Sequence, residues 1–344
     1  MTQFVHLRLH TEYSLTDSTI RIKPLMQAVE KAEMPAVAIT DLNNCFGLVK
    51  FYKAAMGAGI KPILGVDVLL ADETGGDTLF HVILLCHNNT GYRNLMRLVS
   101  RAWQQGQRLG IPRAQRSWIA EFSDGIIMLS GGCDGDVGQA LLAGNTELAE
   151  KRLCEWLALF PERYYLELQR TGREGEEAYI QAAVDLALTH AVPVVATNDV
   201  RFLAASDFNA HEARVCINSG HVLADPKRPK LYSPQQYLRT PAEMAELFAD
   251  IPAALANTVE IAKRCNVSLT LGKNYLPQFP IPEGMTQAEY FCKVSQEGLE
   301  QRLDFLLGDK YPRGTPEFTE KRKPYDERLR VELDVINKMG FPGY

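Results

Sequence analysis

The sequence lacks the long apolar run that a membrane-spanning helix requires, because no stretch of about 18 consecutive apolar residues occurs in it. It also lacks a charged leader followed by an apolar segment, so we expect no signal peptide. The seven cysteines are scattered and form no CxxC pair. This argues against a cysteine-rich zinc module and is typical of reduced thiols in a cytoplasmic protein.

An excess of positive charge is also missing, since 37 Lys and Arg residues stand against 42 Asp and Glu residues and the net charge is −5. A free-standing DNA-binding domain is usually basic, so we do not expect this chain to bind nucleic acid strongly by itself. No GxGxxG motif follows the first predicted strand, which disfavours a dinucleotide-binding sheet. With 344 residues, of which 46% are hydrophobic, the chain is long enough to bury a sizeable core.

What the sequence does contain is a repeated pattern of strand and helix up to about residue 200. Seven apolar, strand-like runs occur, at residues 4–10, 36–41, 62–70, 79–86, 125–131, 164–169 and 193–199. Helical periodicity separates most of them, as at residues 24–32 and 91–102. Strands that alternate with helices predict parallel pairing and a sheet covered by helices. Seven such units favour a closed or nearly closed α/β barrel over an open sheet.

Beyond about residue 205 the pattern becomes helical. Thr240 is a candidate N-cap with Glu243 at the third helical position, which is a capping-box arrangement. The Pro-rich residues 276–284 predict an extended linker. Further helices are predicted at residues 241–248, 251–265, 287–307 and 323–340. We therefore predict a first domain over residues 1–275, with a barrel over about 1–204 and a helical extension over about 205–275. Residues 276–344 are predicted to be a linker and the truncated start of a second domain.

Polar residues lie at or near the ends of several predicted strands, where the active sites of barrels form. They are His10, Asp41, Asp67, His81, Asp199 and Arg201. Each carboxylate alone is better explained as a helix N-cap or an ion-pair partner than as a ligand, and His81 alone as a core histidine with its hydrogen bonds satisfied. Six polar residues that can converge on one cleft favour a functional site. Arg8 shares a strand face with His10, because residues two apart on a strand point the same way, and it is the wrong neighbour for a metal.

Several motifs, in this order, resemble the PHP (polymerase and histidinol phosphatase) domain. They are residues 6–14 (HLRLHTEYS), 38–41 (AITD), 46–52 (FGLVKFY), 59–65 (GIKPILG) and 196–199 (ATND). More narrowly, the chain resembles the N-terminal part of the alpha subunits of bacterial DNA polymerase III of the enteric Gram-negative type, which are C-family replicative polymerases. Residues 232–237 (YSPQQY), 246–264 and 340–344 (GFPGY) share this likeness.

The resemblance implies a distorted, TIM-like barrel of seven strands. In active members nine His, Asp, Glu and Cys side chains hold up to three ions, often Zn²⁺ or Mn²⁺, for phosphoester hydrolysis. The positions that retain a ligand type here are His10, Asp41, Asp67, His81 and Asp199, with Asp67 standing where Glu is usual. The positions that depart from the family pattern are Arg8, Leu42, Gly132, Thr171 and Arg201, although Cys133 would serve for Gly132 after a small shift.

An arginine cannot coordinate a cation, because its guanidinium stays protonated and has no acceptor lone pair. We therefore expect no metal at this site. We hypothesise that Arg8 and Arg201 instead form ion pairs with some of the carboxylates of Asp41, Asp67 and Asp199. The alternative is that both guanidinium groups are solvated at the rim of the barrel.

For function, the resemblance implies part of a DNA-directed DNA polymerase, a nucleotidyltransferase of chromosomal replication in the cytoplasm. Its two Mg²⁺ ions would bind palm aspartates beyond Tyr344, so this chain would need no cofactor and would not polymerise by itself. Its barrel would be a lapsed hydrolase that supports the polymerase core. Expected partners are the proofreading exonuclease, the remainder of the alpha subunit, the sliding clamp, the clamp loader and, through the parent chain, DNA; no membrane is expected.

The alternative is a residual metal-dependent phosphoesterase or pyrophosphatase. In that case His10, Asp41, His81 and Asp199 would still hold one metal ion.

Overall fold

The computed structural model describes residues 4–73, 75–275 and 278–344. The chain forms two compact units, Met1–Ser268 and Leu269–Tyr344. Residues 276 and 277, at the start of the predicted linker, lie outside the described residues, as do residues 1–3 of the first predicted domain. No helix among the described residues combines the length and the apolar character needed to cross a bilayer.

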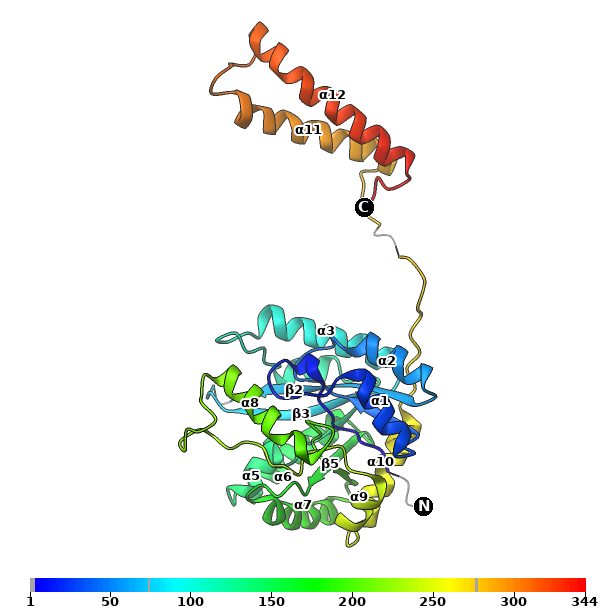
Figure 1. Ribbon diagram of the computed structural model, residues 1–344, viewed down its shortest axis with the longest axis vertical. Helices are drawn as coiled ribbons and strands as arrows, with labels where there is room; N and C mark the ends of the chain where they lie inside the picture. The colour runs from blue at the N-terminus through cyan, green and yellow to red at the C-terminus, as the bar shows by residue number, and fades with distance from the viewer. Residues whose placement is uncertain (1–3, 74, 276–277) are drawn as a thin grey trace. The chain divides into compact units, whose positions relative to one another are not determined.

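Unit one is built on a curled sheet of six strands in the order β1-β2-β3-β4-β5-β6 (Figure 1). The strands are β1 (Ala36–Ile39), β2 (Lys61–Ala71), β3 (Leu79–Cys86), β4 (Ile126–Leu129), β5 (Tyr164–Gln169) and β6 (Val194–Thr197). β1–β2, β4–β5 and β5–β6 pair in parallel, whereas β3 is antiparallel to both β2 and β4. The prediction of parallel pairing is therefore wrong for β3. β2 ends at Ala71 and β3 begins at Leu79, which is too short a connection for the crossover that parallel strands require.

The seventh predicted strand, residues 4–10, is an extended segment with one isolated bridge, Leu9 to Val200. The segment lies between β1 and the chain after β6, because Ala38 N donates to His6 O at 2.9 Å and His10 N donates to Val200 O at 3.0 Å. Leu9 N donates to the Thr40 hydroxyl at 2.9 Å instead of to a strand carbonyl. The described residues thus form six strands where seven were predicted, because side-chain acceptors interrupt the backbone ladder of the first segment.

Among the described residues, ten α-helices belong to unit one and two to unit two. Figure 1 shows helices of unit one on both sides of its sheet. Those of unit one are α1 (Ile22–Lys31), α2 (Leu48–Gly57), α3 (Asn89–Gln105), α4 (Arg116–Glu121), α5 (Asp136–Leu142), α6 (Thr146–Leu159), α7 (Glu176–His190), α8 (Phe208–Ser219), α9 (Pro241–Leu247) and α10 (Pro252–Arg264). The predicted capping box at Thr240 and Glu243 is confirmed at the start of α9.

An apolar core fills the interior of the curled sheet with side chains such as Leu7, Ile63, Ile127 and Val195. Ile261 of α10 belongs to the same cluster, so this helix packs against the core. Burial of such aliphatic side chains contributes roughly 1.5–3 kcal/mol each. The rest of the interior is polar, and it is described below.

Unit two consists of α11 (Gln287–Leu307) and α12 (Pro316–Lys338), which pack through Leu303, Leu307 and Phe318. The predicted helix at residues 287–307 is confirmed. α12 begins at Pro316, earlier than the predicted start at residue 323, and continues through Pro324.

Close backbone packing at Gly91 provides a test of the fold. A Cβ atom at Gly91 of α3 would lie 1.7 Å from the carbonyl oxygen of Gly125, which cannot rotate away. We expect Gly91→Ala to lower the free energy of unfolding by about 1–3 kcal/mol in urea denaturation. Gly57→Ala on α2 is the matched control, since nothing lies within 4 Å of its added Cβ, and it should be neutral or slightly stabilising. Equal losses of unfolding free energy in both variants would contradict the close approach of Gly91 to the Gly125 carbonyl.

Candidate functional site

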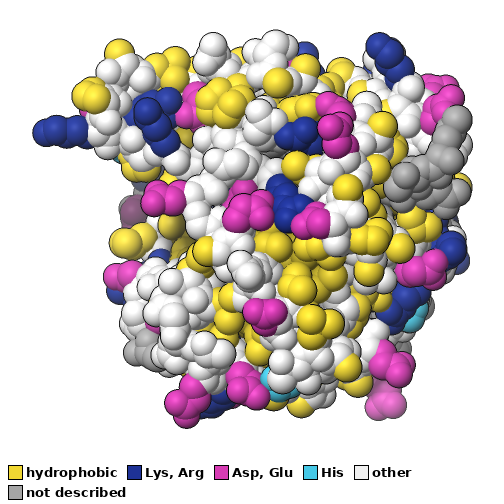
Figure 2. All heavy atoms as spheres, turned by 90° about the horizontal axis from the view of Figure 1, so that it is seen from below, with side chains coloured by type: hydrophobic (Ala, Val, Ile, Leu, Met, Phe, Trp, Pro, Cys, Tyr) yellow, Lys and Arg dark blue, Asp and Glu magenta, His cyan; other side chains and the backbone are white. Residues whose placement is uncertain are grey.

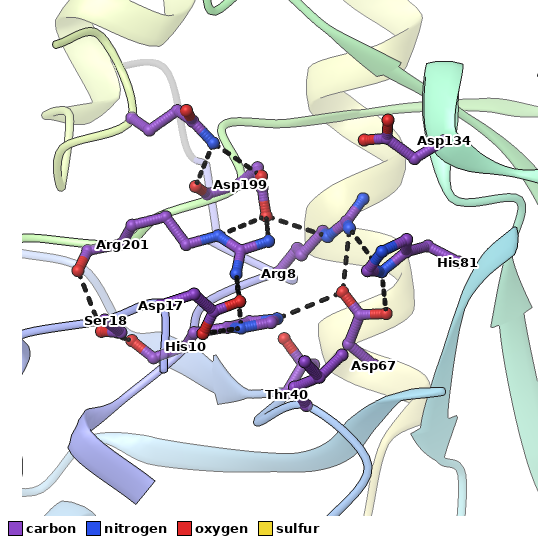
Figure 3. Close-up of polar contacts among 12 residues, drawn as sticks. Arg8, His10, Asp17, Ser18, Thr40, Asp67, His81, Asp134, Asp199 and Arg201 are labelled. Atoms are coloured by element: carbon purple, nitrogen blue, oxygen red, sulfur yellow. Dashed lines mark hydrogen bonds and ion pairs between the residues drawn. The ribbon is translucent and has the colours of Figure 1, made fainter. Parts of the chain in front are cut away.

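A cluster of charged side chains is buried inside unit one, beside the apolar core (Figure 3). Arg8 comes from the N-terminal extended segment, Asp67 from β2, Glu167 from β5 and Asp199 from the turn after β6. Each of these four residues is at most 1% exposed. Charges buried to this degree must be paired, since an isolated ion is too costly to remove from water.

Arg8 joins three carboxylates. Its Nη2 donates to Asp67 Oδ2 at 2.8 Å, its Nε lies 3.0 Å from Asp199 Oδ1, and its Nη1 lies 3.5 Å from Glu167 Oε2. Burial acts against the charge of this guanidinium, but the three carboxylates outweigh burial and raise its pKa. Arg8 also lowers the pKa of Asp67, and Arg201 together with Arg8 lowers that of Asp199, in spite of the burial of both carboxylates.

Arg201 reaches the same cluster from the opposite side of Asp199 (Figure 3). Its Nη2 donates to Asp199 Oδ1 at 2.7 Å, and its Nη1 donates to Asp17. His10 lies between Asp17 and Asp67, with Nδ1 3.2 Å from Asp17 Oδ1 and Nε2 3.1 Å from Asp67 Oδ2.

His10 is a cation in this arrangement. Burial and the neighbouring guanidinium of Arg201 act against its charged form, but Asp17 and Asp67 outweigh them and raise the pKa of His10 to about 9. Asp17 accepts from His10 Nδ1 and from Arg201 Nη1. These two nitrogen atoms lie 2.7 Å apart, and the carboxylate between them holds both in place. The cluster thus joins cations to carboxylates, except where Arg201 and His10 meet beside Asp17.

The hypothesis that Arg8 and Arg201 form ion pairs with the predicted carboxylates is confirmed for Asp67 and Asp199. Asp41 behaves differently. Its carboxylate accepts from Thr11 N at 2.6 Å and from Ser14 Oγ at 2.8 Å. In the part of the chain that the structure describes, neither arginine pairs with Asp41.

Two other predicted positions touch the cluster. His81 Nδ1 lies 2.7 Å from Asp67 Oδ1, and its side chain is 25% exposed. Gly132 has a φ of +62°, and a Cβ atom there would lie 3.2 Å from Gln169 Oε1, so this position borders the polar interior. Cys133 instead packs against the apolar side chains of Leu168 and Tyr179.

The two remaining predicted positions, Leu42 and Thr171, form local hydrogen bonds through their backbone N–H groups. Leu42 forms an isolated bridge with Asp67, and its N–H donates to Ser14 Oγ at 3.1 Å. Thr171 donates through its N–H to Glu176 at 2.6 Å and also through its hydroxyl, at the start of α7.

Sequence reasoning missed Asp17 and Glu167. Glu167 stands in the apolar run of β5, and a charged residue in a buried strand was a usable signal. Asp17 lies in a loop and gave no signal, because only tertiary structure brings it to Arg201. Sequence reasoning also did not assign residues 232–237 to the site. In this segment Gln236 Nε2 donates to Asp199 Oδ2 at 2.7 Å, and the Tyr232 ring centre lies 5.4 Å from the Arg201 guanidinium.

Asp199 also has a φ of +42°, in the left-handed region that side chains rarely adopt. Such a conformation persists where the surrounding contacts fix it, and here Arg8, Arg201 and Gln236 all hold the Asp199 side chain.

The residues present do not fit the metal ions that the family resemblance implies. Within residues 4–73, 75–275 and 278–344, no group of three or more His, Cys, Asp and Glu side chains is arranged to hold a metal ion. The guanidinium groups of Arg8 and Arg201 bind the carboxylate oxygens that a cation would need. They cannot coordinate a cation themselves.

Comparisons with family models and with known proteins show what this chain is similar to. Residues 6–171 match the family model of the PHP domain. Its particular resemblance is to replicative polymerase subunits. It is 54% identical over 341 residues to DNA polymerase III subunit alpha of Pseudomonas aeruginosa and 54% identical over 342 residues to that of Escherichia coli (strain K12). These matches cover 99% of this chain and 29% of each relative. The resemblance stated from the motifs is confirmed.

Among solved structures, an amidohydrolase from Chromobacterium violaceum with bound sulfate is 12% identical, with a TM-score of 0.44. The match covers 61% of this chain and 96% of that structure.

Proposed function

We propose that this chain is the N-terminal part of a DNA polymerase III alpha subunit, and that its PHP domain is a scaffold without hydrolytic activity. One observation carries the second half of the proposal. Arg8 and Arg201 pair with Asp67 and Asp199, the carboxylates that would otherwise bind metal. Two fixed positive charges replace those of metal ions and neutralise the buried carboxylates without supplying a nucleophile.

The parent protein would then be a DNA-directed DNA polymerase. The chain spans 29% of the length of the Pseudomonas aeruginosa relative, so most of that relative lies outside the matched region. We propose that the Mg²⁺-binding palm aspartates belong to that part, and that unit two is where the palm begins. The scaffold would support the polymerase core in the cytoplasm and dock the proofreading exonuclease, in a replicase with sliding clamp, clamp loader and DNA.

The alternative of a residual hydrolase is disfavoured by the contacts of its four ligands. His10 and Asp199 both face Arg201, and Asp41 is bonded by Thr11 and Ser14. Only His81 keeps a partly exposed side chain. A single metal would have to displace the buried guanidinium of Arg201 to reach His10 and Asp199, and the donors of Thr11 and Ser14 to reach Asp41.

Elemental analysis and a hydrolase assay test the proposal together. We expect protein purified without chelator to contain only substoichiometric zinc and manganese. We also expect no hydrolysis of p-nitrophenyl phosphate, its bis ester or pyrophosphate when either metal is added, because arginine cannot act as a ligand. Stoichiometric metal, with hydrolysis that the double variant Asp41→Ala, His81→Ala abolishes, would establish the alternative instead.

A further inference from the structure

The neighbouring helices α2 and α3 carry charge of one sign only. Their basic residues are Lys50, Lys53, Arg93, Arg97 and Arg101, and neither helix contains Asp or Glu. The whole chain has a net charge of −5. Solvated helices usually intersperse both signs and gain from pairing them along the helix. The absence of acidic residues from both helices therefore needs a reason beyond solubility.

The same two helices expose apolar side chains in rows. Val49 and Met56 of α2 are 46% and 57% exposed, and Met96 and Trp103 of α3 are 39% and 38% exposed. The members of each pair are seven residues apart, so each pair falls on one side of its helix. Phe46, just before α2, is 60% exposed, and its ring centre lies 6.3 Å from that of Trp103. The two rows therefore meet at this aromatic pair.

Both helices cover the same part of the sheet. α2 packs on β2, and α3 packs on β2 and β3. Trp103 Nε1 donates to Asn43 O at 2.7 Å, which ties the end of α3 to the loop that leads into α2. Figure 1 shows both helices along one edge of unit one. The face of unit one in Figure 2, seen from below and away from these helices, mixes acidic, basic and hydrophobic side chains instead.

We define the α2–α3 surface as a set of exposed residues from these two helices and the residue before α2. They are Phe46, Val49, Lys53, Met56, Met96, Arg97 and Trp103. A shallow hollow on α3 is lined by Met96, Arg97, Ser100, Arg101, Gln104 and Gln105. The exposed apolar rows of the two helices, with cations beside them, match the chemistry of an amphipathic helix.

We propose that the α2–α3 surface binds a partner protein through an amphipathic helix with an apolar side and acidic flanks. Charge complementarity carries the choice of partner. Lys53 and Arg97 are exposed, and within the described part of the chain neither has an ion-pair partner. Acidic flanks would pair with both side chains and steer the encounter. The inference rests on the docking role proposed above and deepens it by naming the surface and the chemistry of its partner.

A nucleic acid fits this surface less well. Three of the five cations are already engaged. Arg101 Nη1 donates to Glu121 at 2.6 Å, Lys50 Nζ donates to the Tyr13 hydroxyl at 3.2 Å, and Arg93 Nη2 donates to the Thr90 hydroxyl at 3.5 Å. Nucleic-acid affinity depends on cations that are free to replace counterions at the phosphates. Most of the exposed apolar side chains are Val and Met, which offer no ring for bases to stack on.

Fluorescence anisotropy with the full chain tests the inference. The probe is a labelled peptide of about 18 residues, about five helical turns, with Leu along one side and Glu on the flanks. The double variant Lys53→Glu, Arg97→Glu should weaken binding by about tenfold or more, because two repulsive contacts replace two attractive ones. Val49→Ser with Met96→Ser should weaken it comparably. The control Lys31→Glu with Lys151→Glu, on exposed positions of α1 and α6, should change binding by less than about twofold.

Several outcomes would overturn the inference. One is a peptide that does not bind, or that binds the surface variants and the wild type equally. Another is an oligo-dT strand that binds more tightly than the peptide and is lost with the charge reversal. The proofreading exonuclease of the same organism is titrated in parallel. Exonuclease binding that the surface variants leave unchanged rejects this surface but keeps the docking role, whereas no binding to the wild type rejects the docking role itself.

Discussion

Replacing Arg8 with Ala is expected to lower the free energy of unfolding by about 3–5 kcal/mol, because the change leaves buried carboxylates without their cation. Arg8 is fully buried and is the shared partner of Asp67, Asp199 and Glu167. Urea denaturation followed by tryptophan fluorescence measures the loss. Trp103, Trp118 and Trp156 are the chain's three tryptophans and all lie in unit one, so the signal reports on the unit that holds Arg8.

Arg21→Ala is the matched control for charge removal. The Arg21 side chain is 78% exposed, and its Nε lies 3.8 Å from Glu12, so its loss should change stability by less than about 0.5 kcal/mol. Arg8→Lys should be intermediate, because a single ammonium keeps the charge but cannot match the fork that joins three carboxylates. A loss below about 1 kcal/mol for Arg8→Ala would show that the carboxylates do not depend on the guanidinium.

Stability should also fall steeply on the alkaline side of about pH 6.5. The pKa of His10 is raised from 6.5 to about 9 in the folded chain, so the folded state holds a proton that the unfolded state releases. The stability contributed by this proton is fully present below pH 6.5 and is lost as the pH rises through about 9. The expected slope is about 1.4 kcal/mol per pH unit, and the total loss is about 3 kcal/mol.

On the acid side His6 acts in the opposite sense. Burial lowers the pKa of His6 from 6.5 to about 4, so its contribution is present above pH 6.5 and is lost as the pH falls towards 4. The lowered pKa values of Asp67 and Asp199 add a further loss at more acidic pH. Burial raises the pKa of Glu167, which offsets part of the acid loss. Together these groups place the stability maximum near pH 6.5.

Unfolding free energies measured across pH 4–9 test this profile. His10→Gln should flatten the limb between pH 6.5 and about 8 and leave the acid limb in place, because the raised pKa of His10 links proton release to unfolding there. The raised pKa values of the buried thiols act closer to pH 9, their ordinary value, and above it. His221→Gln, at an exposed position, is the control and should leave both limbs unchanged. A limb between pH 6.5 and about 8 that survives in His10→Gln would show that His10 is not the group that titrates.

The local pattern of the sequence was sufficient for most elements of the fold. Six of the seven predicted runs became strands, and the capping box at Thr240 begins α9. These features depend on residues close in sequence, whose periodicity and turn chemistry act before any tertiary contact forms. The antiparallel pairing of β3 with β2 was not predicted, although the short connection between Ala71 and Leu79 indicates it. The irregular bonding of residues 4–10 was not predicted either, and it depends on which strand edges meet in the folded chain.

The candidate site was also predictable from the sequence only in part. The sequence by itself determined the resemblance to the PHP domain. It also determined that Arg8 and Arg201 stand where that resemblance implies metal ligands, because residue identity alone decides whether a side chain can coordinate a cation. Only the tertiary structure decided which carboxylates receive those charges. It joined Arg8 to Asp199 and brought Asp17 to Arg201, while Asp41 was left to Thr11 and Ser14. Ion pairs between residues so far apart in the chain depend on the closure of the sheet, which no local pattern encodes.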